Sequence, residues 1–175
     1  MAKALILGIW LLLLAPLAAS AADCVVESYF VEPESYGTIM VPIYALIEQA
    51  TSEITVAVHS FEDTNLAEAL IDAHNRGVKV DVLMDYAQAS SEASVAYMLD
   101  EAGIAIYVDT EDTVVDYRFM VVDQEITVTG SYDWCAMRQC TRFDSIVVVR
   151  CREVAESHIL EISMQSVLGK FRRVE

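Results

Sequence analysis

Apolar runs with the composition of strands alternate with segments of helical periodicity along the middle of this chain. Residues 53–60 and 78–84 are rich in Val, Ile and other residues that favour strands. Between them, apolar residues recur at the spacing of one helix face, at Leu66, Ala69, Leu70 and Ala73. The pattern predicts a layered α/β fold.

The remaining predicted elements complete one domain, placed at residues 24–173 of the 175. A hairpin around Asp123-Gln124 is expected to join residues 114–122 to residues 125–129. Other strands are expected at residues 25–31, 104–108 and 145–151, and other flanking helices at residues 39–50, 91–102 and 153–170. The central helix is expected to begin at Asp63, Thr64 or Asn65, with Asn65 and Glu68 as a capping box.

The N-terminus does not belong to this domain. Lys3 precedes an apolar run at residues 4–17, and small residues follow it at residues 18–22. This order is typical of a secretory signal peptide, here residues 1–21, and predicts a secreted or periplasmic protein. An uncleaved N-terminal membrane anchor is the alternative, although the run is shorter than the ~20 residues of a spanning helix.

The charge of the chain bears on its partners. The formal net charge is −16, and one of the few basic residues, Lys3, lies in the predicted signal peptide. Nucleic-acid binding relies on Lys and Arg to replace the counterions of the phosphate backbone. The net charge therefore argues against nucleic acid as a partner.

Four cysteines follow the N-terminal segment, and an even number in an exported chain indicates disulfides. Three pairings are possible, of which we favour Cys135–Cys140 as a local link and Cys24–Cys151 as a bridge between the first and last strands. Four buried free thiols are the alternative if the chain is not exported. No Cys-x-x-Cys pair or neighbouring His supports a metal site, so neither a metal nor a cofactor is predicted.

The second half of the chain contains a set of polar and charged residues, at fixed spacing, that are suited to a phosphate ligand. It consists of Asp116, Arg118, Asp123, Gly130, Ser131 and Asp133, followed by Asp144. Asp116 and Arg118 are two residues apart on a predicted strand, so their side chains share a face. A guanidinium can hold a phosphate through two parallel hydrogen bonds, although Asp116 is its nearer partner.

This spacing resembles the motif of the phospholipase D superfamily, which is His-x-Lys, four residues, Asp, six residues and Gly-Ser-x-Asn. The similarity to the small single-motif, bacterial endonuclease-like members extends over most of residues 25–172. Residues 29–33 (Tyr-Phe-x-x-Pro) resemble their first strand, residues 56–61 their second strand, and residues 73–85 their helix–strand unit. The resemblance implies a phospholipase D-like fold, with one twisted mixed β-sheet flanked by helices.

The resemblance also implies a mechanism that needs no metal. One His attacks phosphorus, and a second His, supplied by the partner in a homodimer, protonates the leaving oxygen. This chain departs from that pattern, because Asp116 stands at the His, Arg118 at the Lys and Asp133 at the Asn. A carboxylate at the His position repels an incoming phosphodiester.

By the resemblance, the expected catalytic residues are Asp116, Arg118, Asp123 and His59, and the expected substrate-binding residues are Ser131, Asp133 and Asp144. Asp144 matches the carboxylate that orients the catalytic His in the family. His59 follows a strand that the resemblance places near the pocket. His158, on the closing helix, is expected at the surface.

Three hypotheses follow for this cluster. It is a structural network of Arg118 with acids; or the carboxylates of Asp116, Asp133 and Asp144 bind a divalent cation; or catalysis runs through Asp116 or His59. The leading expectation is a degenerate phosphodiesterase domain, weakly active or inactive, that serves as a binding or scaffold module. The alternative is an active phosphodiesterase, of phospholipase D or endonuclease type, that hydrolyses phospholipid head groups or nucleic acid.

Overall fold

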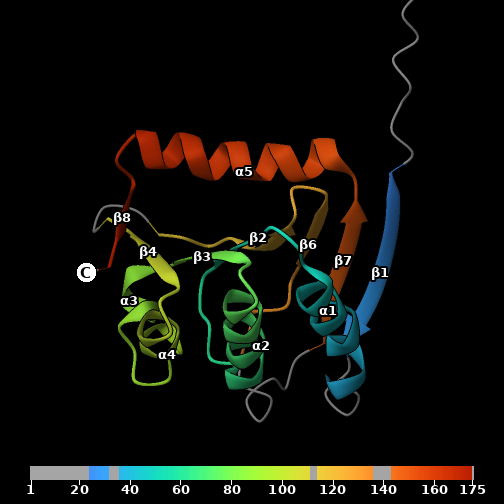
Figure 1. The fold of residues 1–175 in the computed structure, drawn as a ribbon, viewed down its shortest axis with the longest axis horizontal. Coiled ribbons are helices and arrows are strands. Elements are labelled where there is room, and N and C mark those ends of the chain that lie inside the picture. Colours follow the sequence, from blue (N-terminus) through green and yellow to red (C-terminus); the bar gives the residue numbers. More distant parts are fainter. Residues whose placement is uncertain (1–23, 32–35, 111–113, 136–142, 175) are drawn as a thin grey trace, which may run out of the picture.

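The computed structural model describes residues 24–31, 36–110, 114–135 and 143–174. Within these ranges, eight strands form one mixed sheet in the order β1-β7-β6-β5-β2-β3-β4-β8 (Figure 1). The strands are β1 (Val25–Val31), β2 (Glu53–Val58), β3 (Lys79–Met84), β4 (Ala105–Asp109), β5 (Arg118–Val122), β6 (Ile126–Gly130), β7 (Asp144–Arg150) and β8 (Phe171–Arg173). The helices are α1 (Tyr36–Gln49), α2 (Thr64–Asn75), α3 (Tyr86–Ala89), α4 (Ala96–Glu101) and α5 (Arg152–Val167).

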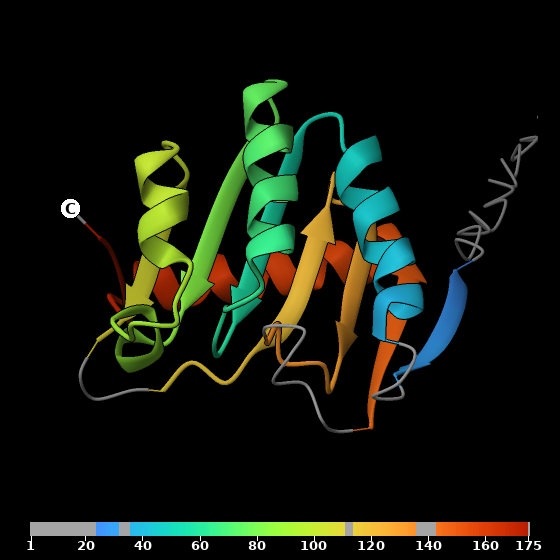
Figure 2. The same ribbon diagram turned by 90° about the horizontal axis from the view of Figure 1, so that it is seen from below.

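The strand directions bring one set of strand ends together. β2, β3 and β4 run parallel, so their carboxyl ends meet at one edge of the sheet, the lower edge in Figure 2. β5 is antiparallel to β2, β6 to β5, and β7 to β6. The start of β5, the end of β6 and the start of β7 therefore lie at that same edge. We call this edge, which carries His59, Arg118, Ser131 and Asp144, the motif edge.

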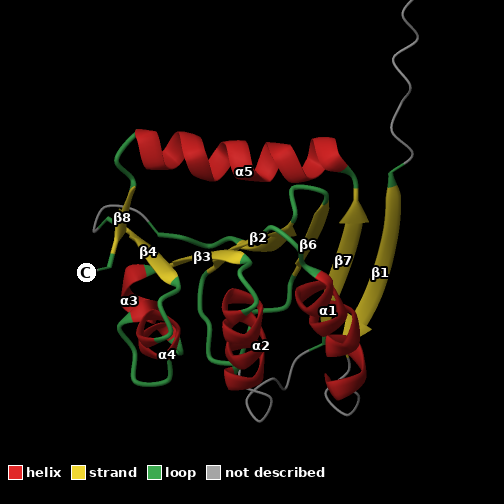
Figure 3. Ribbon diagram, in the orientation of Figure 1, coloured by secondary structure: helices red, strands yellow, loops and turns green. Residues whose placement is uncertain are grey.

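The two faces of the sheet are covered unequally. Helices α1 to α4 lie on one face, and in the described part of the chain α5 alone crosses the other (Figures 1 and 3). The larger core lies beneath α1, α2 and α4 and includes Ile43, Leu70 and Met120. The smaller core lies beneath α5 and includes Phe119 and Ala155. The predicted α/β fold, a twisted mixed sheet flanked by helices, is confirmed.

The predicted N-terminus of α2 is confirmed, but its capping box is wrong. Asp63 is the N-cap, and its side chain accepts hydrogen bonds from the backbone N–H groups of Asn65 (3.0 Å) and Leu66 (3.2 Å). Asn65 lies inside the helix and cannot serve as the cap of a box with Glu68.

The helix predicted at residues 91–102 is wrong in extent, and two elements were missed. Only Ala96–Glu101 forms α4, because the preceding serines favour turns, and Ser94 Oγ accepts a hydrogen bond from the Ala96 N–H at 3.2 Å. The one-turn helix α3 begins directly after β3. The closing helix ends at Val167, before Gly169 with φ of +71°, which leaves the next residues free to form β8.

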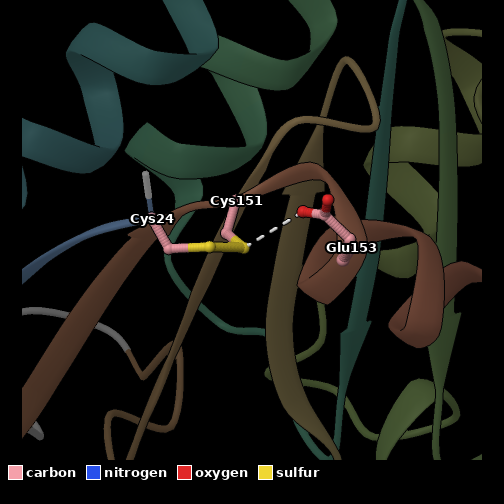
Figure 4. Close-up of side chains that lie close together, drawn as sticks. All are labelled: Cys24, Cys151 and Glu153. Carbon is pink, nitrogen blue, oxygen red and sulfur yellow. Dashed lines mark hydrogen bonds between the residues drawn. A yellow bond between two sulfur atoms is a disulfide. The ribbon is translucent and has the colours of Figure 1, made fainter. Parts of the chain in front are cut away.

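The predicted disulfide between Cys24 and Cys151 is present and joins the start of β1 to the junction of β7 and α5. Figure 4 shows Glu153 beside it, with its Oε2 3.4 Å from Cys151 Sγ. Cys24, Cys151 and Glu153 lie close enough together to bind a metal ion, but only if the disulfide is reduced, because disulfide sulfurs are not thiolate ligands. Cys135 is also disulfide-bonded, and its predicted partner Cys140 lies outside the described residues.

The predicted signal peptide also lies outside the described residues. None of the helices in the described ranges has the length and apolar character needed to cross a bilayer.

Asp123 holds the β5–β6 turn against the start of β2. Its carboxylate accepts hydrogen bonds from the backbone N–H groups of Thr51 (2.9 Å), Ser52 (2.8 Å) and Glu53 (3.0 Å) and from the hydroxyls of Thr51 and Ser52. Partial burial favours the neutral acid, but the hydrogen bonds outweigh it and hold the pKa of Asp123 well below its usual range. Asp123 and Gln124 both have positive φ, at 52° and 54°, as a type I′ turn requires.

Removing the charge of Asp123 is expected to destabilise the fold. Asp123→Asn should lower the free energy of unfolding at pH 7 by about 2 kcal/mol. Hydrogen bonds to a charged group contribute roughly 1.5–3 kcal/mol, and the Asp123 carboxylate is partly exposed, which keeps the expected loss within that range. The depressed pKa means that the contribution is present above the ordinary carboxyl pKa of about 4 and is lost as the pH falls through the folded-state value. Urea unfolding should therefore show a difference that shrinks below about pH 4. The exposed Asp72, changed to Asn, is the control and should show no such difference.

A buried hydroxyl on β6 offers a second test of stability. Thr127 is 0% exposed, and its Oγ1 has no hydrogen-bond partner among the described residues. Thr127→Val replaces the hydroxyl by a methyl of similar shape and should raise the free energy of unfolding by about 1 kcal/mol. Thr129→Val is the matched control two residues along, because the Thr129 hydroxyl donates to the Arg118 carbonyl at 3.0 Å. A loss of stability in Thr127→Val would contradict the assignment and indicate a bound water at this hydroxyl.

Candidate functional site

The topology gathers most of the predicted site residues at the motif edge. His59 follows β2, Arg118 begins β5, Ser131 follows β6, and Asp144 begins β7. Arg118 lies opposite Val58, directly beside the strand end that carries His59. Residues far apart in the sequence therefore meet because neighbouring strands begin and end together.

Arg118 is the centre of this cluster. Its Nη1 lies 2.8 Å from Asp116 Oδ1, and its Nε lies 3.2 Å from Asp133 Oδ1. The side chains differ in exposure, at 29% for Arg118, 65% for Asp116 and 19% for Asp133. The pair with Asp133 is therefore the better shielded, and the pair with Asp116 is weakened by solvent.

Ser131 and Asp144 form a second pair beside the first. The Ser131 hydroxyl donates to Asp144 Oδ1 at 2.9 Å and accepts from the Ser145 N–H at 3.0 Å. The Ser131 N–H in turn donates to the Ser145 carbonyl at 3.0 Å. A Cβ on Gly130 would come within 2.0 Å of that carbonyl oxygen, so only glycine allows β6 and β7 to approach this closely.

The geometry fixes the tautomer of His59. Its Nδ1 lies 2.9 Å from the carbonyl oxygen of Val115, directly before Asp116. A carbonyl oxygen only accepts hydrogen bonds, so Nδ1 carries the hydrogen and the neutral ring has its lone pair on Nε2. His59 therefore lies at the cluster, and the neutral form of its ring would present Nε2 as a base or a nucleophile.

Asp123 is not at the cluster. It follows the far end of β5, at the opposite edge of the sheet from Arg118, and its carboxylate is taken up by the turn that begins β2.

A cavity of about 500 Å³ lies between the start of β5 and α5. Arg118 at the start of β5 and the two residues before it, Asp116 and Tyr117, line one side of it. Ser157, His158 and Glu161 line it from α5. Burial, together with the hydrogen bond that the Tyr117 hydroxyl donates to Glu161 at 3.0 Å, raises the pKa of Tyr117.

His158 was assigned to the surface from the sequence, and its place in this cavity was missed. The available signal was the periodicity of α5, whose inward face carries Ala155, Ile159 and Ile162. His158 is three residues after Ala155 and four before Ile162, so it shares that face.

The three carboxylates of the cluster are not gathered as cation ligands. Among the described residues, the groups that offer three ligand atoms within 4.8 Å of one another comprise only Cys24, Cys151 and Glu153. Asp116 and Asp133 face Arg118, and Asp144 binds Ser131. The geometry therefore favours an anion held by a guanidinium over a cation held by oxygen ligands.

The match to a known family covers most of the chain. Residues 43–164 match the family described as cardiolipin synthase, PLD-like domain. Phospholipase D of Rickettsia prowazekii is 27% identical over 113 residues, which are 65% of this chain and 55% of that protein. The mitochondrial cardiolipin hydrolase of Xenopus tropicalis is 27% identical over 113 residues, which are 65% and 54% of the two chains. The chain spans about half the length of the curated relatives it matches.

Solved structures show the same fold. Nuc of Salmonella typhimurium, a phospholipase D family member, superposes with a TM-score of 0.75 at 24% identity, covering 87% of this chain and 99% of that chain. NucT of Helicobacter pylori superposes with a TM-score of 0.71 at 16% identity, covering 85% and 98%. At these identities the likeness concerns the fold, and the family rests on the sequence match. The resemblance seen in the motif spacing is therefore confirmed, and the chain belongs to the phospholipase D superfamily through its PLD-like domain.

Proposed function

We propose that this chain is a phosphodiester-binding PLD-like domain whose hydrolytic activity is weak or absent. The observation that carries the proposal is the placement of Arg118 between two carboxylates, one of which, Asp116, occupies the motif position of the catalytic His. Binding and catalysis make different demands on this site, and each is considered in turn.

Arg118 is suited to bind a phosphate oxygen. Its contacts with Asp116 and Asp133 take two of the five N–H donors of the guanidinium, counted over the described residues. Asp116 is 65% exposed, so a phosphate can displace it at little energetic cost, whereas the more buried Asp133 keeps the guanidinium oriented. With Asp116 displaced and Asp133 still in contact, the planar guanidinium of Arg118 can donate two parallel hydrogen bonds to a phosphate.

Asp116 is poorly suited to the chemistry of the family. An ionised carboxylate has no proton to give to a leaving oxygen, and it repels the phosphodiester that it would have to attack. Asp133 likewise offers acceptors where an amide would offer donors to the phosphate. These substitutions support retained binding with reduced hydrolysis.

The second candidate function is an active phosphodiesterase, and His59 is the observation that favours it. The fixed tautomer leaves Nε2 with a lone pair at the same edge as Arg118. The names of relatives, phospholipase D and cardiolipin hydrolase, point to phospholipid phosphodiesters. The net charge of −16 also favours a small or zwitterionic phosphodiester over nucleic acid.

A homodimer is part of the proposal. The outward side of α5 carries an apolar stripe that continues into the residue after the helix. Its exposed residues are Leu160, Met164 and Val167 in α5 and Leu168 directly after it. The cavity lined by Asp116 and Arg118 opens beside the same helix. A second copy seated on α5 would cover the stripe.

Export is also proposed. The Cys24–Cys151 disulfide supports an oxidising compartment, in agreement with the predicted signal peptide.

Hydrolysis of bis(p-nitrophenyl) phosphate tests the proposed function. The native chain should release little nitrophenol, and the double variant Asp116→His/Arg118→Lys should release about a hundredfold more, because a positioned imidazole contributes roughly 10²–10⁴ in rate. Asp116→Asn/Arg118→Lys is the matched control, since it removes the same charge without adding an imidazole, and it should remain silent. Turnover by the native chain that His59→Gln or Asp116→Ala abolishes would replace the proposal by the second candidate.

The oligomeric state tests the proposed dimer. Sedimentation of the native chain should give twice the protomer mass, and Leu160→Glu should give the protomer mass, because a charge in an apolar interface is costly to bury. Val41→Glu is the control, because Val41 lies on α1, on the other face of the sheet, and is 60% exposed against 59% for Leu160. A native protomer mass, or equal effects of both variants, would contradict a dimer through α5.

A further inference from the structure

The cavity beside Arg118 contains an imidazole that the motif does not account for. His158 comes from α5, yet it lines the same cavity as Asp116 and Arg118. The sequence motif of the family lies wholly in residues 116–133 of this chain, so it assigns no role to this helix residue. The motif position of the catalytic His is occupied by Asp116, and His158 of α5 supplies an imidazole to the same cavity.

Two contacts hold His158 in place. Its Nδ1 lies 2.8 Å from the carbonyl oxygen of Val154, one turn earlier in α5. Its ring packs edge-to-face on Phe119 of the core beneath α5, with centroids 4.7 Å apart. The carbonyl requires a hydrogen on Nδ1, so Nε2 on the other side of the ring is left for a ligand.

The charges that face His158 are few and mixed. The charged residues that line the same cavity are Arg118 at the start of β5, Asp116 just before it, and Glu161 of α5. Tyr117 adds a hydroxyl, which donates to Glu161. A bound phosphodiester would favour an imidazolium, because its oxygens only accept hydrogen bonds.

We propose that His158 is a second phosphodiester-binding residue of this site and that its Nε2–H donates to a phosphate oxygen while Arg118 holds another. The inference rests on the proposed phosphodiester binding at Arg118 and adds a contact from α5. The ligand class is a monoanionic phosphodiester, which fits between a guanidinium and an imidazolium in a cavity of about 500 Å³.

The three histidines of the chain make the contact measurable without any turnover. Proton NMR of the imidazole Cε1–H signals, assigned by single substitutions, follows His59, His74 and His158 separately. The probe is dimethyl phosphate, whose charge does not change near neutral pH. On its addition the His158 signal should move in a saturable way, and its titration midpoint should rise, because the bound anion favours the charged ring.

Substitutions give the matching change in affinity. His158→Gln should weaken dimethyl phosphate binding at pH 6 about tenfold and remove the increase in affinity as the pH falls, because a charge-assisted hydrogen bond is lost. Glu156→Gln, an exposed change on the same helix outside the cavity, is the control and should leave both unchanged. A melting curve shows that each variant is folded, and His158→Asn serves as a second variant if His158→Gln is not.

The outcomes separate this inference from the proposed function. Saturable binding that Arg118→Gln abolishes, with an unmoved His158 signal and an unchanged affinity in His158→Gln, overturns the role of His158 and leaves the function proposed for Arg118. Movement of the His59 signal in place of His158 also overturns it and assigns the imidazole contact to β2. No saturable binding by the native chain overturns the proposed function, and the role of His158 with it.

Discussion

The antiparallel pairing of β5 with β2 controls where the site can form. β2 runs parallel to β3, so the loop after β2 opens at the carboxyl edge of the parallel strands. Because β5 runs the other way, its first residue, Arg118, lies beside the last residue of β2, Val58. β6 is antiparallel to β5, so it ends at the same edge, just before Ser131. β7 is antiparallel to β6, so it begins at that edge with Asp144. A shift of β5 by one residue would turn Arg118 away and expose its apolar neighbours.

The charges at the motif edge determine which kind of ligand the site can bind. The chain carries a net charge of −16, and Arg118 is a cation set among carboxylates at the motif edge. Asp133 is largely buried and keeps its contact, while Asp116 is mostly exposed and holds its contact weakly. An anion that competes with Asp116 therefore meets a guanidinium that is already oriented, which lowers the ordering cost of binding.

The sequence predicted elements well where local chemistry decides them, and less well elsewhere. Asp63 caps α2, and Asp123-Gln124 turns the β5–β6 hairpin, because each depends on near neighbours in the chain. β8 was missed because three residues form a strand only when β4 offers an open edge. Among the site residues, Asp123 shares the motif spacing but lies at the opposite edge from Arg118, and it contributes to stability through the loop before β2.

The sequence by itself determined the fold family and the chemical identity of the cluster, because strand and helix periodicity and the motif spacing are local properties of the chain. Only the tertiary structure decided which side chains meet. It bound Arg118 to Asp116 and Asp133, joined Asp144 to Ser131, and placed His158 of α5 in the cavity beside β5. The physical reason is that the sheet register and the packing of α5 on Phe119 are set by contacts between residues distant in the sequence, and spacing along the chain does not report such contacts.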